Sequence, residues 1–172
     1  ARHTAREART MGVNWNLAPV VDLDLDHENP VLGTRTLGAD PARVSRLGAA
    51  WIEACQAEGV LACAKHFPGH GRTGADSHLE LPVVRATREA LHTHDLVPFK
   101  AAIAANVASI MTAHVAYPAL DPSGLPATLS RELLTWLLRQ QLKYDGLVVA
   151  DALDMRGLRD AAPDEPDAAL RA

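Results

Sequence analysis

The sequence is poor in cysteine, in aromatic residues and in long apolar stretches. Of its 172 residues, two are cysteines and 4% are aromatic. Cys55 and Cys63 lack the spacing of metal ligands, and we expect both to be buried thiols. No apolar run approaches the roughly 20 residues that a membrane-spanning helix needs. The sequence therefore predicts neither a disulfide-stapled domain nor a membrane span.

Positive charge is also scarce. Lysine and arginine number 17 against 21 acidic residues, for a net charge of −4, and no basic stripe is present. Such a chain lacks the electrostatic footprint of a nucleic-acid-binding protein, so we exclude nucleic acid as a partner. Apolar residues make up 48% of the chain, which is typical of a folded protein. The length corresponds to about one domain.

Short apolar runs alternate with helical patterns along the chain. We predict strands at 13–21, 60–65, 108–112 and 146–150. Between them, Asp40-Pro41 combines a helix cap with proline at the first helical position, and Thr87 and Ser130 are further candidate caps. Strands without in-and-out alternation, separated by helices, are typical of a parallel sheet covered by helices. We therefore predict an α/β fold, and four such units amount to about half of a (β/α)8 barrel.

Polar residues follow each predicted strand, at 22–26, 65–66, 112–114 and 151. In α/β folds the carboxyl ends of the strands face the ligand site. The densest group is Ala64–His78, with three histidines, one lysine and three glycines. Its Gly-His-Gly follows Pro68 and opens no apolar helix, so a nucleotide-binding loop is not predicted.

Three residues are candidates for acid, base or nucleophilic chemistry. Asp151, at a strand end, could attack a substrate carbon, hold a metal, or simply cap a short helix over 152–158. Asp76 and His78, two residues apart on a loop, could pair so that the carboxylate fixes the imidazole for general acid/base work. The same spacing also fits a solvated loop.

Other polar residues suggest ligand binding. Lys65 and His66 stand where a strand ends, and a buried lysine there needs an acceptor such as a sugar hydroxyl. Arg35 could bind a ligand or anchor its own loop. We interpret His70 and His114 as hydrogen-bonded loop residues. A metal-dependent hydrolase using His66, His70, His78 and Asp151 is an alternative, but Pro68 and Gly69 disfavour the helix on which His66 and His70 would chelate one ion.

The segment Ala64–His78 and the residues after it, Leu-Glu-Leu-Pro82, resemble the signature of family 3 glycoside hydrolases of the β-N-acetylglucosaminidase type. Four other segments agree with this resemblance, in chain order: Asn16–Asp22, Ser109–Val115, Pro126–Ser130 and Val148–Met155. The resemblance implies a TIM-like barrel, of which residues 1–172 would be the central part, about strands three to six. The barrel units before and after them would be missing.

The resemblance also implies roles for individual residues. Asp151 would be the nucleophile of a retaining glycosidase, His78 the general acid/base and Asp76 its dyad partner. Lys65 and His66 would bind sugar hydroxyls, and Arg35 the N-acetylglucosamine unit. No metal and no other cofactor is expected. The glycines between Pro68 and Ser77 would form a hinge that brings in His78 when substrate is bound.

The implied activity is exo-acting hydrolysis of terminal β-linked N-acetylglucosamine from a carbohydrate such as a muropeptide, in peptidoglycan turnover. Phosphorolysis and another family 3 β-glycosidase activity are the alternatives, and a non-catalytic carbohydrate-binding piece is a third. We expect the isolated 172 residues, with two open sheet edges, to be unstable and inactive. We expect a cytoplasmic protein, with secretion or lipoprotein anchoring as alternatives because an export signal could lie before residue 1.

Overall fold

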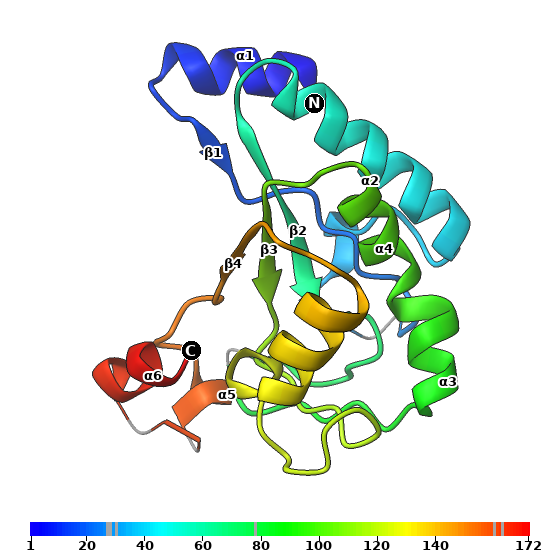
Figure 1. Ribbon diagram of the computed structural model, residues 1–172, viewed down its shortest axis with the longest axis vertical. Coiled ribbons are helices and arrows are strands. Elements are labelled where there is room, and N and C mark those ends of the chain that lie inside the picture. The colour runs from blue at the N-terminus through cyan, green and yellow to red at the C-terminus, as the bar shows by residue number, and fades with distance from the viewer. Residues whose placement is uncertain (27–28, 30, 78, 160, 163) are drawn as a thin grey trace.

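A four-stranded parallel sheet lies at the centre of the molecule (Figure 1). The computed structural model describes residues 1–26, 29, 31–77, 79–159, 161–162 and 164–172. The strands lie in chain order and comprise β1 (Trp15–Asn16), β2 (Leu61–Phe67), β3 (Ser109–Thr112) and β4 (Leu147–Val149). The predicted α/β fold with a parallel sheet is confirmed. The assignment of these strands to barrel positions three to six stays a prediction.

Helices α2, α4 and η4 lie along one side of this sheet in Figure 1, where η4 is the yellow helix. The helical segments are α1 (Arg2–Thr10), η1 (Gly33–Arg35), α2 (Pro41–Gln56), α3 (Arg88–Ala90), η2 (Leu91–Asp95), α4 (Val97–Ala104), η3 (Ala127–Leu129), η4 (Glu132–Gln141), α5 (Arg156–Arg159) and α6 (Glu165–Arg171). Within the described ranges, no helix combines the length and apolar character needed to cross a membrane.

The predicted helix caps are confirmed. The Asp40 carboxylate accepts hydrogen bonds from the first turn of α2 at 2.8 and 3.4 Å. Thr87 Oγ1 accepts from the first turn of α3 at 3.1 Å, and Ser130 Oγ accepts from the backbone N–H of Leu133 at 3.1 Å. Each cap satisfies amide groups that a helix start leaves without a partner.

The first predicted strand, 13–21, is wrong in its extent. Only Trp15–Asn16 pairs as a strand, and an isolated bridge at Val20 meets Lys65 further on. Pro19 interrupts the run because proline has no N–H to donate to a neighbouring strand. The segment nevertheless runs alongside β2, since the carbonyls of Ala18 and Pro19 accept hydrogen bonds from β2 amides. The polar residues 22–26, which come after this segment, therefore still begin at the end of the sheet.

The core lies between the sheet and the helices. Ala62, Ala64 and Ile110 point from the strands into a cluster with residues of α2 and α4, and all are buried. At the end of β2, the rings of Phe67 and Phe99 meet edge to face, with centroids 5.4 Å apart. Phe67 directly follows His66, so this contact also fixes the strand end that carries predicted site residues.

Replacing Phe99 with alanine is expected to lower the free energy of unfolding by about 3–5 kcal/mol, because a fully buried ring leaves a cavity beside Phe67. Trp136→Ala is the control, since Trp136 is 49% exposed on η4 and should change stability far less. Chemical denaturation of the protein measures both. Equal losses for the two variants would contradict the assignment of the core.

Candidate active site

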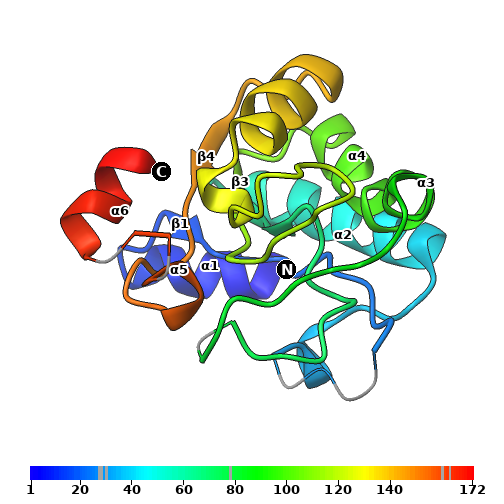
Figure 2. The same cartoon turned by 90° about the horizontal axis from the view of Figure 1, so that it is seen from below.

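Of the predicted site residues that the structure describes, Lys65 and His66 lie near the carboxyl end of β2, and Asp151 follows β4. Figure 2 views this edge of the sheet. There, the loop after β2, drawn in green, runs between the blue segment that follows β1 and the orange helix α5. Contacts join these three segments. The backbone N–H of Asp26 donates to Gly71 O at 3.1 Å, and Gly157 N donates to Ser77 O at 3.1 Å.

The carboxylate of Asp22 is the most enclosed charged group at this edge, with the residue 1% exposed. Its Oδ2 lies 2.7 Å from His66 Nδ1, and its Oδ1 accepts from the backbone N–H of His70 at 2.7 Å. Both oxygens also lie 3.1 Å from the backbone N of His66. Burial by itself raises the pKa of Asp22, but the contacts with His66 and His70 outweigh it and leave the pKa below its ordinary value. Asp22 is therefore an ionised carboxylate at neutral pH.

Asp151 lies on the other side of His66. The Asp151 Oδ2 atom is 3.8 Å from His66 Nε2, and the Asp151 side chain is 26% exposed. Its Oδ1 accepts from the N–H of Ala152 at 2.9 Å. The alternative that Asp151 caps a helix over 152–158 is wrong, because α5 begins only at Arg156.

A cavity of about 640 Å³ opens beside Asp151. Its lining is mostly apolar and comprises Trp15, Leu17, Met111, Val149, Ala150, Asp151, Ala152 and Leu153. Among these described residues, Asp151 is the one ionisable group. A partly exposed carboxylate on an apolar wall suits attack on, or hydrogen bonding to, a bound molecule.

Lys65 and Arg35 form the cationic side of the site. Burial lowers the pKa of Lys65, and the positive charge of Arg35 lowers it further, against an opposing effect of Asp151. Arg35 ends η1, and its guanidinium donates to the carbonyl of Val31 at 3.0 Å. Arg35 therefore anchors its own loop, which is one of the two roles predicted for it. Its positive charge also lowers the pKa of Lys65.

The first part of the loop after β2 is packed and hydrogen-bonded. His70 Nε2 lies 3.0 Å from Ser77 Oγ, and His70 Nδ1 lies 2.8 Å from Thr73 Oγ1. Burial lowers the pKa of His70, which favours the neutral ring. A methyl group on Gly71 would come within 1.7 Å of the carbonyl oxygen of Leu23. Gly71 is therefore required for the close approach of two backbones, and the hinge role of the loop's glycines stays a prediction.

The predicted dyad is only partly described. His78 lies outside the described residues. Asp76 is half-buried, and its carbonyl accepts from the N–H groups of Leu79 and Glu80 at 2.9 and 3.1 Å. Next to it, Ser77 is held by His70 through its hydroxyl and by Gly157 through its carbonyl. The segment that carries Asp76 is thus fixed against both the β2 loop and α5.

The interpretation of His70 and His114 as hydrogen-bonded loop residues is confirmed. His114 Nδ1 lies 2.8 Å from Thr128 Oγ1, and its Nε2 lies 3.0 Å from the carbonyl of Ala152. Burial lowers the pKa of His114. The prediction for the two cysteines is also confirmed, because Cys55 and Cys63 are free and buried.

Asp22 is the residue that the sequence reasoning missed. Sequence reasoning groups it with Asp24 and Asp26 as polar residues after the first strand and assigns it no role. The available signal is its position directly after the apolar Val20-Val21, the place where a parallel strand delivers its first polar side chain.

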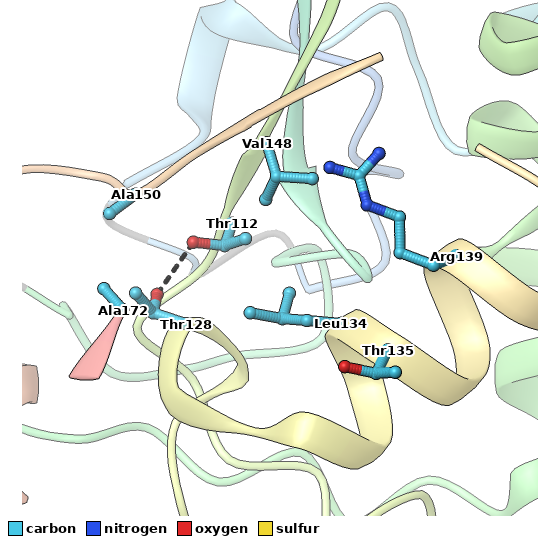
Figure 3. Close-up of a pocket in the computed structure, with 8 residues that line it drawn as sticks. All are labelled: Thr112, Thr128, Leu134, Thr135, Arg139, Val148, Ala150 and Ala172. Atoms are coloured by element: carbon cyan, nitrogen blue, oxygen red, sulfur yellow. Dashed lines mark hydrogen bonds between the residues drawn. The ribbon is translucent and has the colours of Figure 1, made fainter. Parts of the chain in front are cut away.

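A second cavity, of about 340 Å³, lies between η4 and the strands β3 and β4 (Figure 3). It is lined by Thr112, Thr128, Leu134, Thr135, Arg139, Val148, Ala150 and Ala172. Thr112 and Thr128 are hydrogen-bonded to one another across 2.9 Å. None of the predicted site residues that the structure describes lines this cavity, so we place the candidate active site at Asp151 and His66 instead.

Known proteins match this chain over nearly all of its length. Beta-hexosaminidase A from Pseudoalteromonas piscicida is 44% identical over 166 residues, which are 90% of this chain and 28% of the relative. A solved glycoside hydrolase family 3 β-N-acetylglucosaminidase from Paenibacillus sp. str. FPU-7 superposes with a TM-score of 0.90 at 46% identity, covering 91% of this chain and 30% of that one. A solved β-glucoside phosphorylase superposes with a TM-score of 0.91 at 32% identity, covering 94% and 31%.

The chain thus spans less than a third of the length of each of these three proteins. The family model of the glycosyl hydrolase family 3 N-terminal domain matches residues 1–172, and the chain belongs to this family.

Proposed function

We propose that the whole protein is a retaining exo-β-N-acetylglucosaminidase that releases terminal β-linked N-acetylglucosamine. The observation that carries the proposal is the position of Asp151, partly exposed beside an apolar cavity and 3.8 Å from His66 Nε2. The names of the β-hexosaminidase and β-N-acetylglucosaminidase relatives support N-acetylglucosamine as the sugar that is released. We further propose that muropeptides of peptidoglycan turnover are its natural substrates, and that these 172 residues are the central part of a barrel domain.

In this mechanism Asp151 attacks the anomeric carbon, and the leaving oxygen takes a proton from His78. A covalent glycosyl-Asp151 intermediate forms, and His78 then removes a proton from the water that hydrolyses it. Asp76 holds the His78 ring. Lys65, His66 and Arg35 bind the sugar. In this proposal the nucleophile follows β4 in the sequence, and the acid/base belongs to the segment between β2 and α3.

Loss of the acid/base should depend on the leaving group. In the full-length protein, His78→Ala is expected to slow hydrolysis of aryl N-acetyl-β-glucosaminides most for poor leaving groups, which need protonation, and Asp76→Ala should show the same trend more weakly. Asp151→Asn should lower kcat by about a thousandfold or more for every leaving group. Steady-state kinetics across a leaving-group series measures these effects.

His94→Ala is the matched control for the histidine, because His94 is exposed on η2. Asp40→Asn is the control for the aspartate, because asparagine caps a helix as well as aspartate does. An unchanged ratio of rates across the series in His78→Ala would count against the acid/base role.

Phosphorolysis is a second candidate, favoured by the similarity to a β-glucoside phosphorylase. A neutral imidazole acting as the base adds no negative charge beside Asp151 and so does not repel phosphate. Under the main proposal, turnover in phosphate buffer should give free N-acetylglucosamine. Analysis of the sugar products by mass spectrometry tests this, and N-acetylglucosamine 1-phosphate as the main product would replace hydrolysis with phosphorolysis.

A further inference from the structure

The contact between Asp22 and His66 determines which nitrogen of the His66 ring carries a proton. An ionised carboxylate has only acceptor atoms, so the 2.7 Å contact requires Nδ1 of His66 to donate. A neutral imidazole has one N–H, and its second nitrogen is then an acceptor. The neutral His66 ring therefore presents the lone pair of Nε2 on its other side.

The carboxylate cannot readily turn away from this contact. Its Oδ1 accepts from the backbone N–H of His70 at 2.7 Å, and both oxygens lie 3.1 Å from the backbone N of His66. Asp22 is almost completely enclosed, so no water competes for its oxygens at the surface. The backbone of the β2 end thus holds Asp22, and Asp22 holds the ring.

The environment of Nε2 shows what the lone pair faces. In the neutral ring with a proton on Nδ1, Nε2 is an acceptor, and the Asp151 Oδ2 atom lies 3.8 Å from it, which is beyond a hydrogen bond. A hydroxyl group can donate its proton to one of them. Sugars carry several such donors, and the cavity beside Asp151 is large enough to admit one.

We propose that Asp22 is a positioning residue that fixes His66 in the Nδ1–H form, so that Nε2 accepts a hydrogen bond from a substrate hydroxyl beside Asp151. The hydroxyl-bearing ligand rests on the proposed function above. The state of the ring does not, because it follows from contacts among the chain's own residues.

The Asp22→Asn variant tests this with minimal change in shape. The side-chain oxygen of the introduced asparagine can keep the contacts with the backbone N–H groups of His66 and His70. Its amide nitrogen then replaces Oδ2 and donates to His66 Nδ1, which moves the ring proton to Nε2. Nitrogen-15 NMR of the histidine rings in the unliganded full-length protein, at about pH 8.5 where an ordinary histidine is neutral, reports which nitrogen is protonated.

The expected result is protonation of Nδ1 in the wild-type protein and of Nε2 in Asp22→Asn, with Asp40→Asn unchanged from wild type. Protonation of Nε2, or of both nitrogens, in the wild-type protein would overturn the proposal. The same holds if the proton stays on Nδ1 in a folded Asp22→Asn. The wild-type spectrum alone is decisive if the variant does not fold.

Kinetics give the second readout. Asp22→Asn should lower kcat/KM for an aryl N-acetyl-β-glucosaminide by about 10- to 100-fold, because Nε2 then carries a proton and no longer accepts the hydrogen bond of the substrate hydroxyl. Fluorine cannot donate a hydrogen bond. When the hydroxyl at one particular ring position is replaced by fluorine, the resulting loss of kcat/KM should therefore be smaller in Asp22→Asn than in the wild-type protein.

If no position behaves in this way, the role toward substrate is wrong even where the ring state agrees. The wild-type protein could instead carry the ring proton on Nδ1 and yet hydrolyse no N-acetylglucosaminide. That result would refute the proposed function, but the control of the His66 ring by Asp22 would still hold.

Discussion

The buried charge of Asp22 is the constraint on which the candidate site depends. Removing a carboxylate from water is destabilising by several kcal/mol unless hydrogen bonds replace its hydration. Here the replacements are the ring of His66 and the backbone amides of His66 and His70. All three donors belong to the end of β2 and the loop that follows it. The chain can therefore bury this charge only when that loop takes one conformation.

Two histidines near this anion are shifted toward their neutral forms. Burial lowers the pKa of His70 and of His114, which favours their uncharged rings. Neutral imidazoles offer one donor and one acceptor each, whereas charged ones offer only donors. Such rings can pair with groups that both donate and accept, as the hydroxyls of the proposed sugar substrate do.

The sequence predicts what depends on local chemistry and fails where distant segments meet. Three strands and the caps at Asp40, Thr87 and Ser130 follow from apolar runs and cap residues, and all are present. The close approach of Gly71 to the carbonyl of Leu23 is not predicted, because it joins residues 48 positions apart. Asp22 differs from Asp24 and Asp26 in the sequence only by directly following Val20-Val21, and its partners become visible only in the fold. The proposed roles of Asp151, Asp76 and His78 rest on family resemblance.

The distance in sequence between Asp22 and its hydrogen-bond partners has a consequence for the assembly of the site. Asp22 and its partners are 44 and 48 residues apart in the chain, with all of α2 between them. Contacts of such long range form only after the intervening segment has closed into its crossover. The helices can begin to form from their own caps, but His66 acquires a fixed ring only once β1 and β2 lie side by side. A chain in which β1 and β2 have not yet paired therefore contains the site residues without the assembled site.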